Sequence, residues 1–232
     1  MLETERLVLR HLTLGDLDEL AALYRDPEVR RYFPEGTLTY EETREELEWC
    51  IDVYDGRYGY GLWATVRKDR DELIGRCGLL PWRATETPEG ELILEAADEH
   101  PVDEVTYEIE LGYLLGREHW GLGLATEAAR AIVDNALRTL RPPRLICLFD
   151  PRNVASRRVA ERVGFAFDRE VLLDGERLPH ALFARREYPH SVIPSVTRCP
   201  GFEKPTRPRM VLGPIGPYHL LGKRSPSSRC GE

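Results

Sequence analysis

The chain has 232 residues, of which 42% are hydrophobic and 31% are charged, as in an ordinary soluble protein with one sizeable core domain. No apolar run reaches membrane-spanning length, and Met1 opens directly onto strand-like sequence. We therefore expect a cytoplasmic protein with no membrane partner. The five cysteines form no C-x-x-C pair, which argues against a disulfide framework and against a zinc site.

The charge is distributed unevenly. Residues 188–232 hold seven Lys/Arg and two Asp/Glu, about +5, so residues 1–187 hold twenty-five against thirty-eight, about −13, consistent with the net charge of −8. An acidic core disfavours nucleic acid as a partner and would attract a cationic amine by long-range steering. The same charge would also serve solubility alone, and both interpretations stay open.

The first third of the chain alternates strand and helix patterns. Residues 5–12 alternate between apolar and polar side chains, which predicts a half-buried strand. Residues 14–24 have helical spacing, and a second helix is predicted from Thr39, because Glu42 three residues later completes a capping box.

A hairpin and an acidic insertion follow. Residues 62–68 and 73–81 are strand-like runs joined by a polar turn, which predicts a β-hairpin. Residues 83–104 then carry eight acidic residues and one basic residue around a short apolar run. We expect an insertion with local β-character at most, forming a solvated surface loop, with an acidic lip that recruits a cationic substrate as the alternative.

Residues 107–140 contain a strand, a glycine turn and a helix. The small residues Gly121, Gly123 and Ala125 alternate in the turn, and apolar residues then recur at helical spacing up to position 140. The first-turn amides of that helix would point into the turn unpaired, with partial positive charge. This arrangement predicts an anion site that needs no lysine.

The remaining elements complete an α/β domain over residues 1–187. Residues 144–149 form a continuous apolar run, as expected of a strand covered on both faces. A helix follows with Asn153 as its N-cap, and residues 165–173 and 178–186 predict a last hairpin. Residues 188–232 hold eight of the seventeen prolines, and we expect this basic tail to be disordered.

The glycine turn reads G-x-G-x-A, which lacks the third glycine of the dinucleotide fingerprint and the lysine of a P-loop. It resembles the pyrophosphate loop of the GNAT N-acetyltransferases, Q/R-x-x-G-x-G/A, with Trp120 in place of the usual Gln or Arg. The segment HWGLGLATEA is similar to the subgroup of ribosomal-protein alanine N-acetyltransferases. The segments TERLVLR and DPRNVASRRVAERVGF resemble the same subgroup.

This resemblance implies the GNAT fold, an α+β arrangement with a mixed, mostly antiparallel sheet and helices on both faces. It implies acetyl-CoA as the co-substrate, no metal, and a primary amine as acceptor, either a protein N-terminus or a small amine. A non-catalytic acyl-CoA-binding sensor is the alternative function. The sequence leaves the oligomeric state open and allows a homodimer.

The resemblance also implies a cofactor site around the glycine turn. The end of the preceding strand would pair with the pantetheine arm, the turn would hold the pyrophosphate, and an asparagine would bind the arm from the next helix. The predicted cofactor-binding residues are Leu114, Leu115, Trp120, Gly121, Leu122, Gly123, Leu124, Ala125, Thr126 and Asn153.

Catalysis requires a base for the protonated amine and a proton for the leaving thiolate. Glu108 and Glu110 share one strand face, where burial would raise a carboxyl pKa. The E-L-G-Y order resembles the subgroup at Glu110, which we predict to be the base. By the same resemblance Ser156 protonates the thiolate, and Tyr113 belongs to the catalytic set, since a main-chain amide near residues 111–113 would polarise the acetyl carbonyl.

Other residues are weaker candidates. His119 and His180 are further acid or base candidates, with His119 expected to pack beside the turn. The segment between the first two helices, with Arg31, Tyr32 and Phe33, is a candidate wall of the acceptor pocket, although aromatic residues near helices mostly serve packing.

Overall fold

The computed structural model describes residues 1–88, 92–96, 106–173 and 176–186. The predicted tail, 188–232, lies outside these residues. The helices are η1 (Leu14–Asp16), α1 (Leu17–Arg25), α2 (Tyr40–Trp49), the π-helix η2 (Cys50–Tyr58), η3 (Arg117–His119), α3 (Leu124–Thr139) and α4 (Val154–Arg162). The strands are β1 (Leu2–Glu3), β2 (Leu7–His11), β3 (Leu62–Arg67), β4 (Glu72–Glu86), β5 (Leu92–Ala96), β6 (Thr106–Leu115), β7 (Arg144–Phe149), β8 (Ala166–Leu173) and β9 (Glu176–Arg186).

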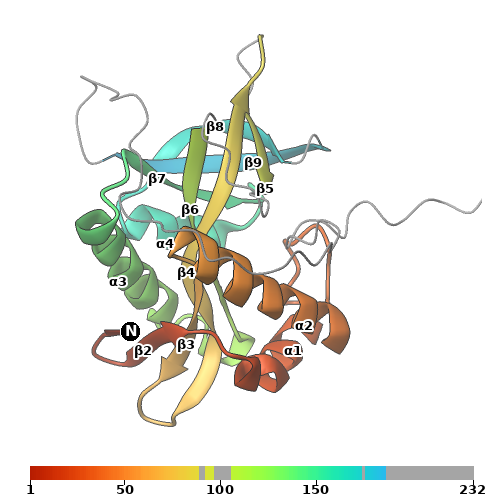
Figure 1. Ribbon diagram of the computed structural model, residues 1–232, viewed down its shortest axis with the longest axis vertical. Helices are drawn as coiled ribbons and strands as arrows, with labels where there is room; N and C mark the ends of the chain where they lie inside the picture. Colours follow the sequence, from red (N-terminus) through yellow and green to blue (C-terminus); the bar gives the residue numbers. More distant parts are fainter. Residues whose placement is uncertain (89–91, 97–105, 174–175, 187–232) are drawn as a thin grey trace, which may run out of the picture.

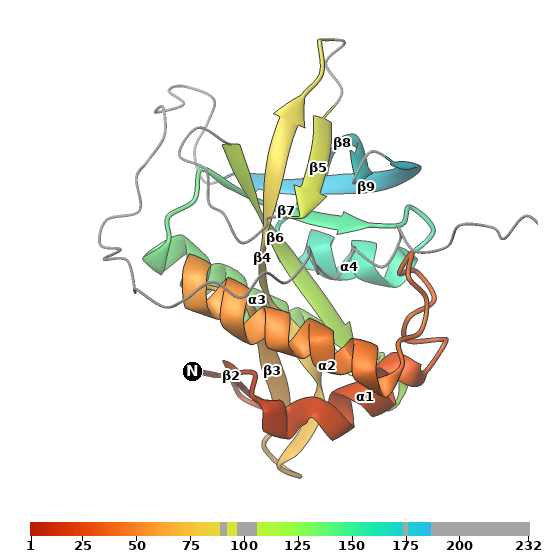
Figure 2. The same ribbon diagram turned by 45° about the vertical axis from the view of Figure 1, so that its right-hand side comes forward.

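The strands form one mixed sheet in the order β1-β2-β3-β4-β5-β8-β9-β7-β6, with β6 also paired to β4. Only β5–β8 and β6–β7 are parallel among the described pairs. Helices α3 and α4 cover one face, and α1 and α2 cover the other (Figures 1 and 2). The predicted mixed, mostly antiparallel sheet with helices on both faces is therefore confirmed.

Helix α2 begins where its capping box predicts. The Thr39 hydroxyl accepts from the Glu42 amide at 3.2 Å, and the Glu42 carboxylate accepts from the Thr39 amide at 2.8 Å, so two otherwise unpaired amides are satisfied. After Trp49 the helix widens into the π-helix η2, which ends at Gly59 in the left-handed conformation. No pattern in the sequence predicts this widening.

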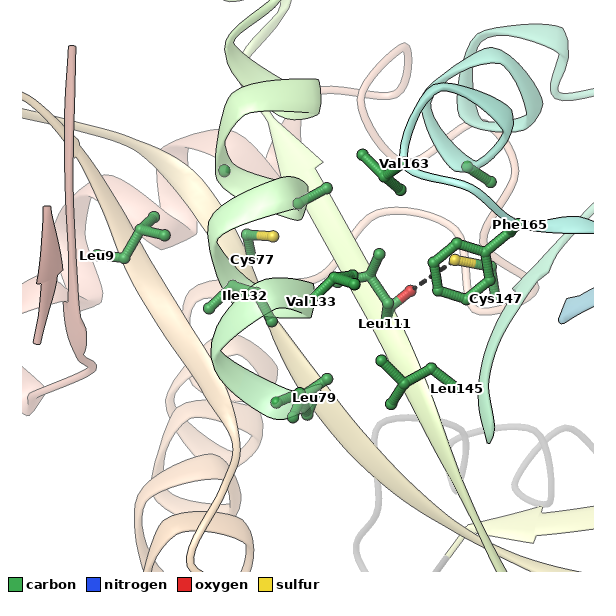
Figure 3. Close-up of a cluster of buried hydrophobic side chains, with 14 of the residues drawn as sticks. Leu9, Cys77, Leu79, Leu111, Ile132, Val133, Leu145, Cys147, Val163 and Phe165 are labelled. Carbon is green, nitrogen blue, oxygen red and sulfur yellow. Dashed lines mark hydrogen bonds between the residues drawn. The ribbon is translucent and has the colours of Figure 1, made fainter. Parts of the chain in front are cut away.

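The main core lies between α3 and the sheet. The inward face of α3 is formed by buried small and aliphatic residues, which pack on leucines and cysteines of β2, β4, β6 and β7 (Figure 3). Alanines at three of these positions let the helix approach the sheet closely, while each fully buried leucine contributes roughly 2 kcal/mol of hydrophobic stabilisation. The buried residues of α3 are Leu124, Ala128, Ala129, Ile132, Val133 and Ala136.

The acidic insertion is structured where it is described, so the prediction of a solvated loop was wrong there. Strand β4 runs on to Glu86 and pairs with β5, and β5 pairs in parallel with β8 through Ile93 and Leu94. Strands β4, β5, β8, β9, β7 and β6 thus close into a ring. The ring has an apolar filling, and the alternation of Leu92 and Leu94 supplies part of it. Residues 89–91 and 97–104 of the insertion lie outside the described residues.

The splay between β6 and β7 positions the site. The two parallel strands pair at one register position only, Glu110 with Ile146, and then diverge. Opposite them, β6 pairs with β4 in unbroken register from Thr106 to Leu115. Gly112 lies within this unbroken pairing, so the gap arises from the divergence of β7. A Cβ at Gly112 would lie 2.9 Å from the end of the Leu80 side chain, which would have to shift to accommodate it.

Candidate active site

A cleft opens at the splay between β6 and β7. It encloses about 800 Å³ of empty space, including its open mouth. The cleft brings together four of the predicted site residues, Glu110, Tyr113, Asn153 and Ser156, with two of the predicted acceptor-wall residues, Tyr32 and Phe33. These residues come from β6, α4 with its N-cap, and the segment after α1, which are distant in sequence.

Glu110 is a buried carboxyl at the inner end of this cleft. Its Oε2 accepts from the indole Nε1 of Trp82 at 2.6 Å, and the carboxylate also accepts from the main-chain amide of Leu148. Burial raises the pKa of Glu110 to about 7, and the two hydrogen bonds and Arg76 only partly oppose it. A carboxyl with this pKa can accept a proton near neutral pH.

Glu108 has a different environment on the same strand face. Arg144 donates to both of its carboxylate oxygens and also lies 3.4 Å from the Asp168 carboxylate. Glu108 is therefore engaged in an ion pair between β6 and β7, and it does not line the cleft. The geometry favours Glu110 over Glu108 as the acid–base residue of the cleft.

Tyr113 and Ser156 link the sheet to α4. The Tyr113 hydroxyl donates to the main-chain carbonyl of Ser156 at 2.7 Å, and burial raises the pKa of Tyr113 well above its usual value. The Asn153 Oδ1 accepts from the Ser156 amide at 3.1 Å and caps α4. This cap uses the carboxamide oxygen of Asn153 and leaves its NH₂ group available to a ligand, and the Ser156 hydroxyl lies in the same cleft.

The glycine turn has the predicted shape. Gly121 and Gly123 have φ of +73° and +78°, and Gly123 is the N-cap of α3. Within the described part of the chain, we find no hydrogen bond from the amides of residues 121–126 to a main-chain carbonyl. A Cβ added at Gly121 would meet no atom within 4 Å. Open space beside unpaired amides at a helix N-terminus fits a diphosphate.

Three of the predicted cofactor-binding residues differ in kind from the rest. The Trp120 indole donates to the Leu115 carbonyl at 2.8 Å, so this side chain braces the turn against the end of β6. The side chains of Leu114 and Leu115 are buried in the core. Only the main-chain edge of this part of β6 can face a pantetheine arm, and that edge is not paired with β7.

Sequence reasoning missed the residues that hold the turn in place. Glu127, in the first turn of α3, accepts from the Thr4 hydroxyl at 2.6 Å and from the Arg6 amide at 2.9 Å. Arg6 in turn donates to the Leu122 carbonyl at 2.9 Å. The available signal was the charge complementarity of the TER and ATEA segments, which lie within the stretches that resemble the GNAT subgroup.

A buried polar network behind the acceptor wall was also missed. Arg30 lies 3.2 Å from Glu35, and Arg76 lies 3.1 Å from Glu46, which also accepts from the Tyr24 hydroxyl at 3.0 Å. The network joins α1, α2, β4 and the segment between the helices, and its two arginines line the cleft. Burial raises the pKa of Glu35 to about 7.

Other candidates lie away from the cleft or outside the described side chains. Arg31 is exposed and pairs with Glu28, so it does not line the cleft. His119 is buried in η3 directly before the turn, as expected. The side chain of His180 is outside the described residues. Among the described residues no group of three His, Cys, Asp or Glu could hold a metal ion, and no helix is long and apolar enough to cross a membrane.

Comparison with known proteins agrees with this geometry. The family model described as an acetyltransferase (GNAT) domain matches residues 6–166. The uncharacterized protein YkkB of Bacillus subtilis is 31% identical over 188 residues, which cover 81% of this chain and 96% of YkkB. A crystal structure of an acetyltransferase from Agrobacterium tumefaciens has a TM-score of 0.62 and 26% identity, over 80% of this chain and 94% of that one.

A second similar structure contains coenzyme A. It is RimL, a ribosomal L7/L12 alpha-N-protein acetyltransferase, with a TM-score of 0.56 and 18% identity over 79% of this chain and 95% of RimL. At this identity the similarity concerns the fold.

Proposed function

This chain belongs to the GNAT acetyltransferase family and is an acetyl-CoA-dependent acyltransferase, and from that premise we propose how its cleft acts. We propose that the protein transfers the acetyl group directly to a primary amine, with Glu110 as the general base. The acceptor is a protein N-terminus or a small amine. The observation that carries the proposal is the buried Glu110 carboxyl, with a pKa of about 7, at the inner end of the cleft.

The turn at residues 121–126 binds the diphosphate of acetyl-CoA through main-chain amides, and the open edge of β6 pairs with the pantetheine arm. Asn153 uses its NH₂ group to hold that arm. The similar fold of RimL in complex with coenzyme A supports this placement. Acetyl-CoA supplies an activated thioester carbonyl, which a main-chain amide near residues 111–113 polarises.

In the reaction, a bond forms between the amine nitrogen and the acetyl carbon, and the thioester C–S bond breaks. Glu110 accepts the proton that the amine must lose, directly or through one water. The Ser156 hydroxyl donates a proton to the departing thiolate. Tyr113 positions Ser156, since its hydroxyl holds the Ser156 main chain at 2.7 Å.

The test measures the release of free thiol from acetyl-CoA by the wild type and by Glu110→Gln. Peptide N-termini, polyamines and aminoglycosides serve as the acceptors. We expect turnover with at least one amine, and a loss of about 10²- to 10⁴-fold in kcat for Glu110→Gln with coenzyme A affinity unchanged. Glu170→Gln, an exposed position on β8, is the matched control. Tight coenzyme A binding without thiol release from any amine would contradict the proposal and favour an acyl-CoA sensor.

A further inference from the structure

One residue on strand β4, outside the predicted site, donates a hydrogen bond to the Glu110 carboxyl. Trp82 lies on β4, where it pairs across from Glu108, so Glu110 is its diagonal neighbour on the same sheet face. At this spacing an aromatic side chain can reach its diagonal partner. The indole Nε1 donates to Glu110 Oε2 at 2.6 Å, a short bond of the charge-assisted kind.

The surroundings of Trp82 are apolar, and its position is fixed. The side chain is 1% exposed and belongs to the apolar cluster inside the ring, with Leu92 and Leu94 of β5 among its members. Strand β5 belongs to the insertion, so the insertion contributes to the apolar surroundings of the indole. In such an environment a hydrogen bond to an ionised group is much stronger than in water.

We propose that Trp82 is a positioning residue that orients Glu110 and favours its ionised form. The inference rests on the proposed role of Glu110 as the base. The indole can only donate, so its bond stabilises the carboxylate more than the neutral acid. It also fixes Oε2, and the Leu148 amide donates to the same carboxylate.

Other groups near Glu110 bear on the same equilibrium. Arg76 favours the ionised form of Glu110, as Trp82 does. The ionised carboxylate in turn opposes ionisation of the Cys147 thiol and of the Tyr113 phenol. Further charges line the cleft. The groups concerned are Arg76 on β4, Tyr113 on β6, Cys147 on β7, Arg30 after α1 and Asp150 directly after β7.

The experiment has an activity arm and a spectroscopic arm. Trp82→Phe keeps an aromatic ring and removes the donor, so the acidic limb of the kcat/KM pH profile should move up by roughly one to two pH units. Trp63→Phe, on β3 and outside the cleft, should leave the limb in place.

The second arm does not depend on a stable variant at position 82. In protein labelled with ¹⁵N-tryptophan, the Trp82 indole resonance should shift with pH at the same midpoint as the kinetic limb. That shift should vanish in Glu110→Gln. The inference would be overturned if the indole resonance stayed constant from pH 5 to 9. It would also be overturned if the acidic limb of the kcat/KM profile did not move in a folded Trp82→Phe variant. Full turnover in Glu110→Gln would instead contradict the proposed function, whatever the indole shows.

Discussion

Arg6 and Glu127 form a link between the N-terminal strands and the first turn of α3. Glu127 accepts from the Arg6 amide at 2.9 Å and from its Nε at 2.7 Å. Arg6 also donates to the Leu122 carbonyl inside the glycine turn. Three contacts of one arginine therefore fix the turn relative to the sheet, so that the unpaired amides face one direction before a ligand arrives.

We predict that Glu127→Gln weakens coenzyme A binding by about tenfold, because a less ordered turn must pay ordering entropy on binding. The chemical step should be preserved, so kcat at saturating acetyl-CoA should change little. Isothermal titration calorimetry gives the affinity. Asp69→Asn, which removes an exposed ion-pair partner of Arg67, is the matched control and should bind normally. Equal affinity in the wild type and Glu127→Gln would refute the positioning role of this link.

Two glycines offer a matched test of the turn. Gly121 and Gly59 have φ of +73° and +70°, and a Cβ at either would meet no atom within 4 Å. An alanine at each position should therefore cost similar backbone strain, about 1 kcal/mol in the free energy of unfolding. Only Gly121→Ala should weaken coenzyme A binding, since its methyl group would occupy the space beside the unpaired amides. Denaturant titration and calorimetry measure the two effects separately, and equal affinities for both variants would argue against a ligand at the turn.

The local elements were predictable because their signals are local. The Thr39 capping box, the Asn153 cap and the glycine turn each depend on residues within a few positions. The closed ring was not predictable, because the pairing of β5 with β8 joins residues almost 80 positions apart. Acidic residues around Leu92 and Leu94 suggested a solvated loop, although strand alternation buries both leucines and leaves Glu95 of the same strand exposed. Trp82 was missed for the same reason, since nothing near it in sequence indicates a partner at Glu110.

Glu108→Gln should separate stability from catalysis. The change leaves the half-buried Arg144 without its main carboxylate partner, although Asp168 remains nearby. We expect the free energy of unfolding to fall by about 1–3 kcal/mol, with the acidic limb of the kcat/KM profile unchanged. Chemical denaturation and initial rates over pH 5–9 check both statements. If the acidic limb of the kcat/KM profile shifts as far in Glu108→Gln as in a Glu110 variant, the assignment of Glu110 as the base is wrong.

The buried carboxyl of Glu110 also makes stability depend on pH. The pKa of Glu110 is about 7 in the folded protein against an ordinary value of 4.5, so the folded state favours the protonated form. This pKa difference contributes on the order of 3 kcal/mol to the free energy of unfolding. The contribution is fully present below about pH 4.5 and is lost as pH rises through 7. Glu110→Gln should remove this part of the dependence, so the variant should gain stability relative to the wild type between pH 5 and 8. Thermal unfolding across that range measures it, and parallel pH curves for the two proteins would exclude a buried titrating carboxyl here.

Hydrogen exchange of the glycine turn tests most directly whether the cleft is the acetyl-CoA site. Adding coenzyme A should slow exchange at the amides of residues 121–126 by at least about tenfold, since bound diphosphate oxygens would accept from them, while the turn between β3 and β4 should exchange as before. Unchanged exchange at residues 121–126 under saturating coenzyme A, with protection elsewhere, would contradict the account.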